Sequence, residues 1–105
     1  MENLWKSEND EVNTLLKRGI SLYNHNKYDN AISYFEKAME IEPKNELALW
    51  MKSRSKSKQG NTSEALDLLE MLIKTDVKYK KRAVGTYDKA FENMKDNVRF
   101  MKLLQ

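Results

Sequence analysis

The sequence feature that most constrains the fold is an internal repeat with a period of 34 residues, which brings residue 15 onto residue 49. In the aligned pairs, large apolar residues fall on large apolar ones, and small residues fall on small ones. A repeat of this length is one supersecondary unit, which buries its apolar face only by stacking on a neighbour. The chain is therefore predicted to be a stack of equivalent units. The pairs are Leu15 and Leu49, Gly19 and Ser53, Asn26 and Gly60, Ala31 and Ala65, Ile32 and Leu66, Phe35 and Leu69, and Glu36 and Glu70.

Each unit is predicted to contain two helices. In the first unit, the apolar residues of 12–23 follow helical spacing, the polar residues 24–27 interrupt it, and residues 28–41 resume it. Pro43 ends the second helix, because the residue before a proline is pushed away from helical torsions. The first unit is thus a helix, a short turn and a second helix.

The second unit repeats this plan with different turn residues. Residues 46–58 form its first helix, and Gly60 accepts the positive φ that often ends a helix. Asn61 precedes Glu64 by three residues, which is typical of a capping box at the start of a helix. The buried stripe of that helix is predicted to consist of Leu66, Leu69, Leu72 and Ile73.

The composition favours helices and excludes several classes of site. The 105 residues include one Pro, three Gly and no Cys, which argues against an all-β fold and excludes disulfides and zinc–thiolate sites. The single His25 lies in a polar turn and is predicted to be solvated. There is no Gly-rich phosphate loop, hydrolase elbow or zinc-protease motif, so we expect no enzyme activity, no cofactor and no metal.

Targeting signals are also missing from the sequence. No apolar run approaches the ~18 residues that a membrane-spanning helix needs. The first six residues lack the basic flank and long apolar stretch of a secretion signal. We therefore expect no membrane partner and a cytoplasmic location.

The first unit, residues 12–45, resembles the tetratricopeptide repeat, whose signature is W-x2-L-G-x2-Y…A-x3-F…P over 34 residues. The corresponding residues here are Leu15, Arg18, Gly19, Leu22, Ala31, Phe35 and Pro43. The run 28–32 and the ending 37–43 are also ones that members commonly show. The resemblance implies an all-α fold, a right-handed α-solenoid of two helix-turn-helix pairs plus C-terminal capping helices.

The second unit, residues 46–79, fits this family at Gly60, Ala65 and Leu69. It departs from the family pattern at Lys52 and Lys56, which replace large apolar residues, and at Val77, which replaces the proline. We expect a single domain over residues 1–105, with an N-terminal extension at 1–11.

Residues 76–105 are similar to the capping tail of small family members. The tail is predicted to form a helix over 76–87 with Asp76 as N-cap, and shorter helices over 88–94 and 97–104. It would cover the open face of the second unit, because an uncapped solenoid leaves apolar surface in water. The covering residues would be Phe91, Met94, Phe100, Leu103 and Leu104.

The family resemblance implies a concave groove that binds a protein or peptide partner. An apolar groove edged by Arg54 and Lys58 would fit a partner segment that is apolar with acidic character. The known clamp for a C-terminal carboxylate is not expected, because Leu16, Ile20 and Met51 occupy three of its positions. The residues expected in the groove are Asn13, Leu16, Lys17, Ile20, Tyr23, Asn24, Leu47, Trp50, Met51, Arg54 and Lys58, although Trp50 and Met51 could equally belong to the core.

The charge distribution leaves two alternatives open. Residues 1–46 hold six Lys/Arg and nine Asp/Glu, a net charge of −3, and residues 47–105 hold thirteen and seven, a net charge of +6. One alternative is self-association into a homo-oligomer, since two units are short for a repeat protein and Leu4 and Trp5 could pack on a neighbour or on the groove. The weaker alternative is nucleic-acid binding through the basic runs 52–58 and 78–82.

Overall fold

The computed structural model describes residues 6–85 and 89–105, and these residues form helices and loops without a strand. The predicted all-α class is confirmed. The division of the chain into an extension, two units and a tail stays a prediction, as does the right hand of the solenoid. The helices are α1 (Asp10–Asn24), α2 (Tyr28–Ile41), α3 (Glu46–Lys58), α4 (Thr62–Thr75), α5 (Lys78–Val84) and α6 (Val98–Leu103), with a 3-10 turn at Glu92–Met94.

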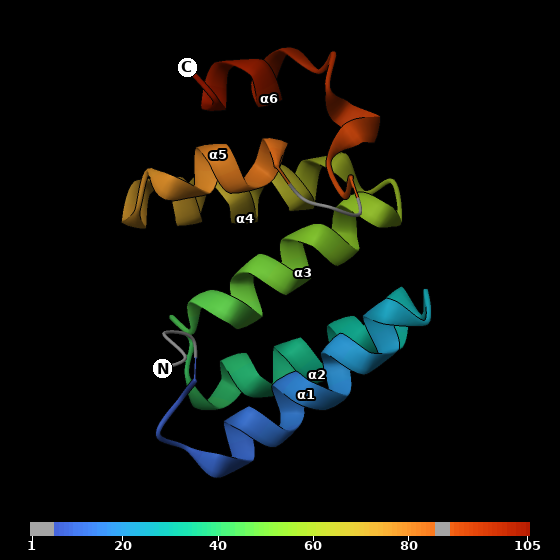
Figure 1. The fold of residues 1–105 in the computed structure, drawn as a ribbon, viewed down its shortest axis with the longest axis vertical. Coiled ribbons are helices and arrows are strands. Elements are labelled where there is room, and N and C mark those ends of the chain that lie inside the picture. Colours follow the sequence, from blue (N-terminus) through green and yellow to red (C-terminus); the bar gives the residue numbers. More distant parts are fainter. Residues whose placement is uncertain (1–5, 86–88) are drawn as a thin grey trace.

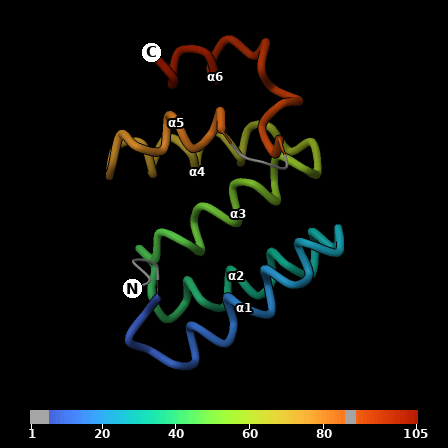
Figure 2. Tube along the Cα trace, viewed as in Figure 1, coloured from blue at the N-terminus to red at the C-terminus, as the bar shows by residue number. Residues whose placement is uncertain are grey.

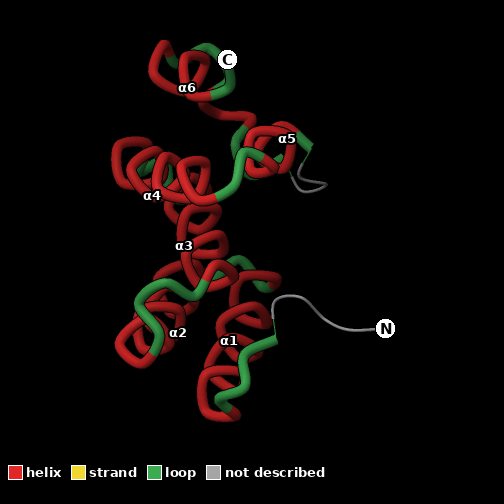
Figure 3. Tube along the Cα trace, turned by 90° about the vertical axis from the view of Figure 1, so that its left-hand side faces the viewer, coloured by secondary structure: helices red, strands yellow, loops and turns green. Residues whose placement is uncertain are grey.

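The helices stack along the long axis of the molecule, which measures 38 × 27 × 25 Å (Figure 1). The pair α1 and α2 lies at one end, α3 crosses the middle, and α4 and α5 follow (Figure 2). The short α6 lies at the opposite end from α1, and the view turned by 90° keeps the same order (Figure 3). Consequently α3 has neighbours on both sides, whereas α1 has neighbours on one side only.

The predicted ends of the helices are largely confirmed. The side chain of Asn45 accepts a hydrogen bond from the Ala48 N–H (2.9 Å) and caps α3 at its predicted first residue. The helix α2 ends at Ile41, and Glu42, before Pro43, has left helical torsions with φ −129° and ψ 85°. Gly60 adopts φ +81° in the turn between α3 and α4, where other residues would be strained.

One helix begins earlier than the apolar pattern indicates, and one predicted cap forms a different hydrogen bond. The helix α1 begins at Asp10 rather than at residue 12, because the side chain of Asn9 accepts a hydrogen bond from the Val12 N–H (3.0 Å). Asn61 does hold the N-cap position of α4, but its amide donates to the Glu64 carboxylate (3.3 Å) instead of accepting from the backbone.

Small residues on the first helix of each unit allow close packing on the second helix. A Cβ added to Gly19 would lie 2.4 Å from the Phe35 ring, so a glycine is the residue that fits. One period later, Ser53 is fully buried and donates a hydrogen bond to the Ala65 carbonyl (2.9 Å). The two units therefore share the close packing of their helices. In the first unit a glycine lies against a ring, and in the second a serine donates a hydrogen bond.

The helix α3 is buried on nearly all sides, which explains its unusual sequence. Ser53, Ser55 and Ser57 are fully buried, and each hydroxyl donates to a backbone carbonyl. Lys52 pairs with Glu36 of α2 (3.0 Å), and Lys56 pairs with Glu64 of α4 (2.9 Å). These two lysines replace apolar residues because their stems pack in the helix interface while their amines meet carboxylates.

The predicted helices of the tail are wrong in their bounds. The helix predicted over 76–87 runs from Lys78 to Val84 with Gly85 as its C-cap, and positions 86–87 of the prediction lie outside the described residues. Asp76 is the extended C-cap of α4, although its carboxylate does accept a hydrogen bond from the Lys78 N–H (2.9 Å). The helix predicted over 88–94 is reduced to the 3-10 turn, because Lys89 has a φ of +54° that a helix does not allow. The last helix, predicted over 97–104, is α6 with Asn97 as its N-cap.

The tail packs on the second unit as expected. Phe91, Met94 and Phe100 are buried, and Leu103 and Leu104 are partly buried against the core. The Phe91 ring lies 5.6 Å from that of Trp50 and 6.1 Å from that of Phe100, measured between centroids.

One arginine of the tail also holds α6 onto α4. The Arg99 guanidinium donates to Asp67 (2.7 Å) and to Glu70 (3.1 Å), both on α4. The C-terminal end of the stack is thus capped by aromatic packing on α3 and by ion pairs to α4.

Candidate functional site

The structure separates the predicted groove residues into a buried set and an accessible set. Five of the eleven are buried: Leu16, Tyr23, Trp50, Met51 and Arg54. The other six are half-buried or exposed: Asn13, Lys17, Ile20, Asn24, Leu47 and Lys58.

Trp50 and Met51 belong to the core and do not line an open surface. Trp50 is 3% exposed and Met51 is 4% exposed. The Trp50 ring is covered by Tyr79 of α5 (5.5 Å between centroids) and by Phe91 of the tail. The capping segments therefore fill the space that a partner would need in order to reach this face of α3.

Arg54 is a buried cation that lies between two aromatic rings. Its guanidinium carbon lies 5.0 Å from the centroid of Tyr23 and 5.8 Å from that of Trp50, and Nη1 lies 3.4 Å from the Met51 sulfur. Only 8% of the residue is exposed. The predicted role of Arg54 as an accessible cation at the groove edge is therefore not what the structure supports, because its charge faces the ring systems of two units.

The accessible set lies on α1 and at the two ends of α3. On α1, Lys17 and Asn24 are exposed and Ile20 is half-buried. On α3, Leu47 in the first turn and Lys58 at the last residue are half-buried. Among these five residues are two apolar side chains, Ile20 and Leu47, and two cations, Lys17 and Lys58.

Asn13, the remaining member of the accessible set, holds the N-terminal segment. Its Oδ1 accepts a hydrogen bond from the Ser7 N–H (2.9 Å), and its Nδ2 donates to the Ser7 carbonyl (2.6 Å). Sequence reasoning missed this contact, because no local pattern connects the two residues. The predicted contacts of Leu4 and Trp5 lie outside the described residues.

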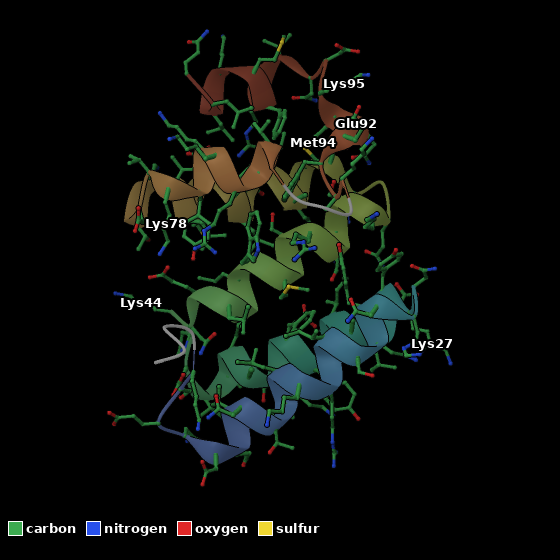
Figure 4. All side chains as sticks on the ribbon, in the orientation of Figure 1. Lys27, Lys44, Lys78, Glu92, Met94 and Lys95 are labelled. Carbon is green, nitrogen blue, oxygen red and sulfur yellow. The ribbon has the colours of Figure 1, made fainter. Side chains whose placement is uncertain are left out.

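Ser7 also connects the extension with the loop between the two units. Its hydroxyl donates to Glu42, which in turn accepts a hydrogen bond from the Asn45 amide (3.0 Å). The hydrogen bonds from Ser7 and Asn45 lower the pKa of the Glu42 carboxyl. A pocket of about 290 Å³ adjoins this network, and Lys44 and Lys78 lie on the same edge of the molecule in Figure 4. The pocket is lined by Lys6, Ser7, Glu42, Lys44, Asn45, Glu46 and Lys78.

Much of the positive charge in the basic run 52–58 is used inside the molecule. Lys52 and Lys56 are paired with carboxylates, Arg54 is buried, and Lys58 is half-buried. In the second run, 78–82, Lys78 lies near Glu46 (3.9 Å) and Asp76 (3.4 Å), whereas Lys81 is exposed. Phosphate binding depends on accessible cations, so the nucleic-acid alternative stays a prediction.

Tyr79, in the second basic run, is a structural residue. It is fully buried, and its hydroxyl donates to Glu46 (2.7 Å). Burial and this hydrogen bond raise the pKa of the Tyr79 hydroxyl. Its ring therefore packs on α3, and its hydroxyl links α5 to the start of α3.

The described residues contain no group of three or more His, Cys, Asp or Glu side chains that could hold a metal ion. His25 is exposed, and its Nδ1 lies 2.7 Å from the Ser21 carbonyl in the same turn. No helix in the described part of the chain has the length and apolar character required to cross a membrane.

Comparison with known proteins gives a match at the level of the family. No curated protein and no solved structure shows significant similarity to the chain. A family model described as tetratricopeptide repeat matches residues 22–85, which run from the end of α1 to the end of α5. This range covers more than half of the 105 residues and includes the turn, helix pair and unit boundary described above. The chain belongs to the tetratricopeptide repeat family.

Proposed function

We propose that this chain is a protein-interaction module that binds a partner segment on the accessible face of α1 and α3. Tetratricopeptide repeats generally mediate protein–protein interaction, and members of the family are typically scaffolds without enzyme activity. The partner segment is proposed to be apolar with acidic character. The cytoplasmic location remains a prediction from the sequence.

The chemistry of the partner is inferred from the predicted groove residues that are not buried. Among these, Ile20 and Leu47 supply the apolar part of the proposed face, and Lys17 and Lys58 supply its charge. Cations beside a partly apolar surface attract acidic segments and disfavour basic ones. The partner is thus selected by weak apolar contacts and by charge at their edges.

A displayed library of random peptides tests this proposal, because selection from a library does not require an identified partner. Peptides selected on the full chain should be enriched in apolar residues next to Asp or Glu. The double variant Lys17→Glu and Lys58→Glu should lose the acidic enrichment, because it reverses both cations of the face. The matched control is Lys27→Glu and Lys95→Glu, which reverses two exposed cations elsewhere (both labelled in Figure 4). Acidic enrichment that survives in the Lys17 and Lys58 variant would overturn the proposed face.

Self-association is the second candidate function. Among the described residues, six large apolar side chains are exposed, and four of them lie in α5, in α6 or next to α5. They are Val77, Val84, Val98 and Met101. Sedimentation velocity over a range of protein concentrations tests this candidate, and a monomer at every concentration would rule it out.

A further inference from the structure

The segment of residues 6–8 is bound to α1 through the main chain of Ser7. Asn13 accepts from the Ser7 N–H and donates to the Ser7 carbonyl, so one amide uses both main-chain groups of Ser7. These two groups are available together in a segment that is not helical, since a helix uses them in its own hydrogen bonds. The side chain of Asn13 therefore binds the main chain of Ser7 and makes no hydrogen bond to its side chain.

The contacts of this segment are polar and few. Besides the bonds to Asn13, the Ser7 hydroxyl donates to Glu42 and accepts from the Asn9 N–H (2.9 Å). Lys6 and Glu8 are exposed, and Ser7 is half-buried. Asn9 is the N-cap of α1, where its side chain accepts from the Val12 N–H, so it stays with the helix. Residues 6–8 carry no apolar side chain, and they can leave their position without exposing apolar surface.

The tail segment that packs on α3 differs from the N-terminal segment, because its contacts are apolar. Residues 90–94 lie on α3, where the Asn93 amide donates to the Ser57 carbonyl (2.8 Å). Phe91 and Met94 of that segment are each only 2% exposed and belong to the core. Its release would expose the core, so the N-terminal segment is the one that can be displaced.

We propose that residues 6–8 act as a built-in competitor of partner binding. This inference rests on the proposed function, in which Asn13 belongs to the partner-binding face. An extended partner segment that uses the Asn13 amide displaces Ser7 from it. A competitor tethered by a few residues has an effective concentration in the millimolar range, and it lowers the apparent affinity for the partner accordingly.

The experiment uses the full chain and a synthetic peptide of residues 1–8 added in solution. In the variant Ser7→Pro, the tethered segment has no N–H to donate to the Asn13 Oδ1. This oxygen can then accept from the N–H of Ser7 in the added peptide. Nuclear magnetic resonance of the Asn13 side-chain amide measures the binding. We expect a saturable shift in Ser7→Pro and at least about tenfold weaker binding in the unchanged chain.

Two controls make the result specific. Ser7→Ala keeps the N–H donor and loses only the hydroxyl, so the peptide should bind it much more weakly than it binds Ser7→Pro. A peptide methylated on the Ser7 nitrogen should not shift the Asn13 amide of any variant. Equal peptide binding by Ser7→Pro and the unchanged chain, or no binding by a correctly folded Ser7→Pro, would overturn the competitor role. Neither result would affect library selection, so failure here can be distinguished from failure of the proposed function.

Discussion

The guanidinium of Arg54 on α3 lies 5.0 Å from the centre of the Tyr23 ring on α1, and it joins the first helices of the two units. Its second aromatic contact, with Trp50, continues toward Tyr79 and Phe91 of the capping segments. One buried cation therefore connects the first unit, the second unit and the tail. This arrangement leads to the first prediction.

Replacing Arg54 with Met should lower the free energy of unfolding by about 1–2 kcal/mol, because the stem packing survives while the cation–π contacts are lost. Urea denaturation followed by tryptophan fluorescence measures this change. The matched control is Lys17→Met, which removes an exposed cation from α1 and should change stability by less than about 0.5 kcal/mol. Equal effects of the two substitutions would contradict the structural role of Arg54.

Replacing Gly19 with Ala should destabilise the first unit by about 1–3 kcal/mol, because the new methyl would meet three atoms of the Phe35 ring at 2.4–2.9 Å. The effect should shrink in the background Phe35→Leu, which removes the ring. Gly60→Ala is the control: it strains a backbone with φ +81° but meets no atom within 4 Å. A double-mutant cycle should therefore show coupling to Phe35 for residue 19 and none for residue 60.

Replacing Ser57 with Ala should loosen the tail and cost about 1–2 kcal/mol, since the Ser57 hydroxyl donates to the Ala90 carbonyl in a fully buried position. Hydrogen exchange of the 90–94 backbone should accelerate more than that of α1. Ser63→Ala, at an exposed position of α4, is the matched control and should leave the exchange of residues 90–94 unchanged. An unchanged exchange rate in the Ser57 variant would argue against this anchor.

Acid should destabilise the fold, because several carboxylates form ion pairs or hydrogen bonds in the folded chain. Arg99 and Lys74 lower the pKa of Glu70, Lys56 and Asn61 lower that of Glu64, and the Lys78 N–H lowers that of Asp76. A lowered pKa means that the unfolded chain binds protons more readily than the folded one. The stabilisation is therefore present above the ordinary Glu value of 4.5 and is lost as the pH falls below it.

The urea midpoint should accordingly fall as the pH drops from neutral to below the ordinary carboxyl range. Glu70→Gln should reduce this dependence, because it removes one of the groups that take up the extra proton. Glu40→Gln, at an exposed position of α2, serves as the control and should leave the slope unchanged. A midpoint that does not depend on pH in the acidic range would show that these contacts contribute no linkage.

The helices of the two units could be predicted because their signals are local. Pro43 and Gly60 act at helix ends through their own backbone chemistry, and Asn61 holds the predicted N-cap position of α4. The small residues at positions 19 and 53 followed from the period of the repeat, whereas the contact of Gly19 with Phe35 comes from the structure. The family resemblance stated from these residues agrees with the family model that matches the chain.

The tail and the candidate site depended on contacts between distant residues. The left-handed backbone of Lys89 shortens the tail helix, and nothing in its residue type indicates a positive φ. Lys52 looks exposed in the sequence, because its partner Glu36 lies on another helix. The burial of Trp50 could not be predicted from the repeat alone, because Phe91 of the tail covers its ring.

The sequence places an excess of negative charge in the first half and of positive charge in the second. The structure uses part of this difference inside the molecule, because Glu36 meets Lys52 and Glu46 meets Lys78 across successive elements of the stack. Both pairs are partly open to water and are therefore screened by salt. Salt should therefore weaken these two contacts between neighbouring helix pairs, while the core and the hydrogen bonds within each helix are kept.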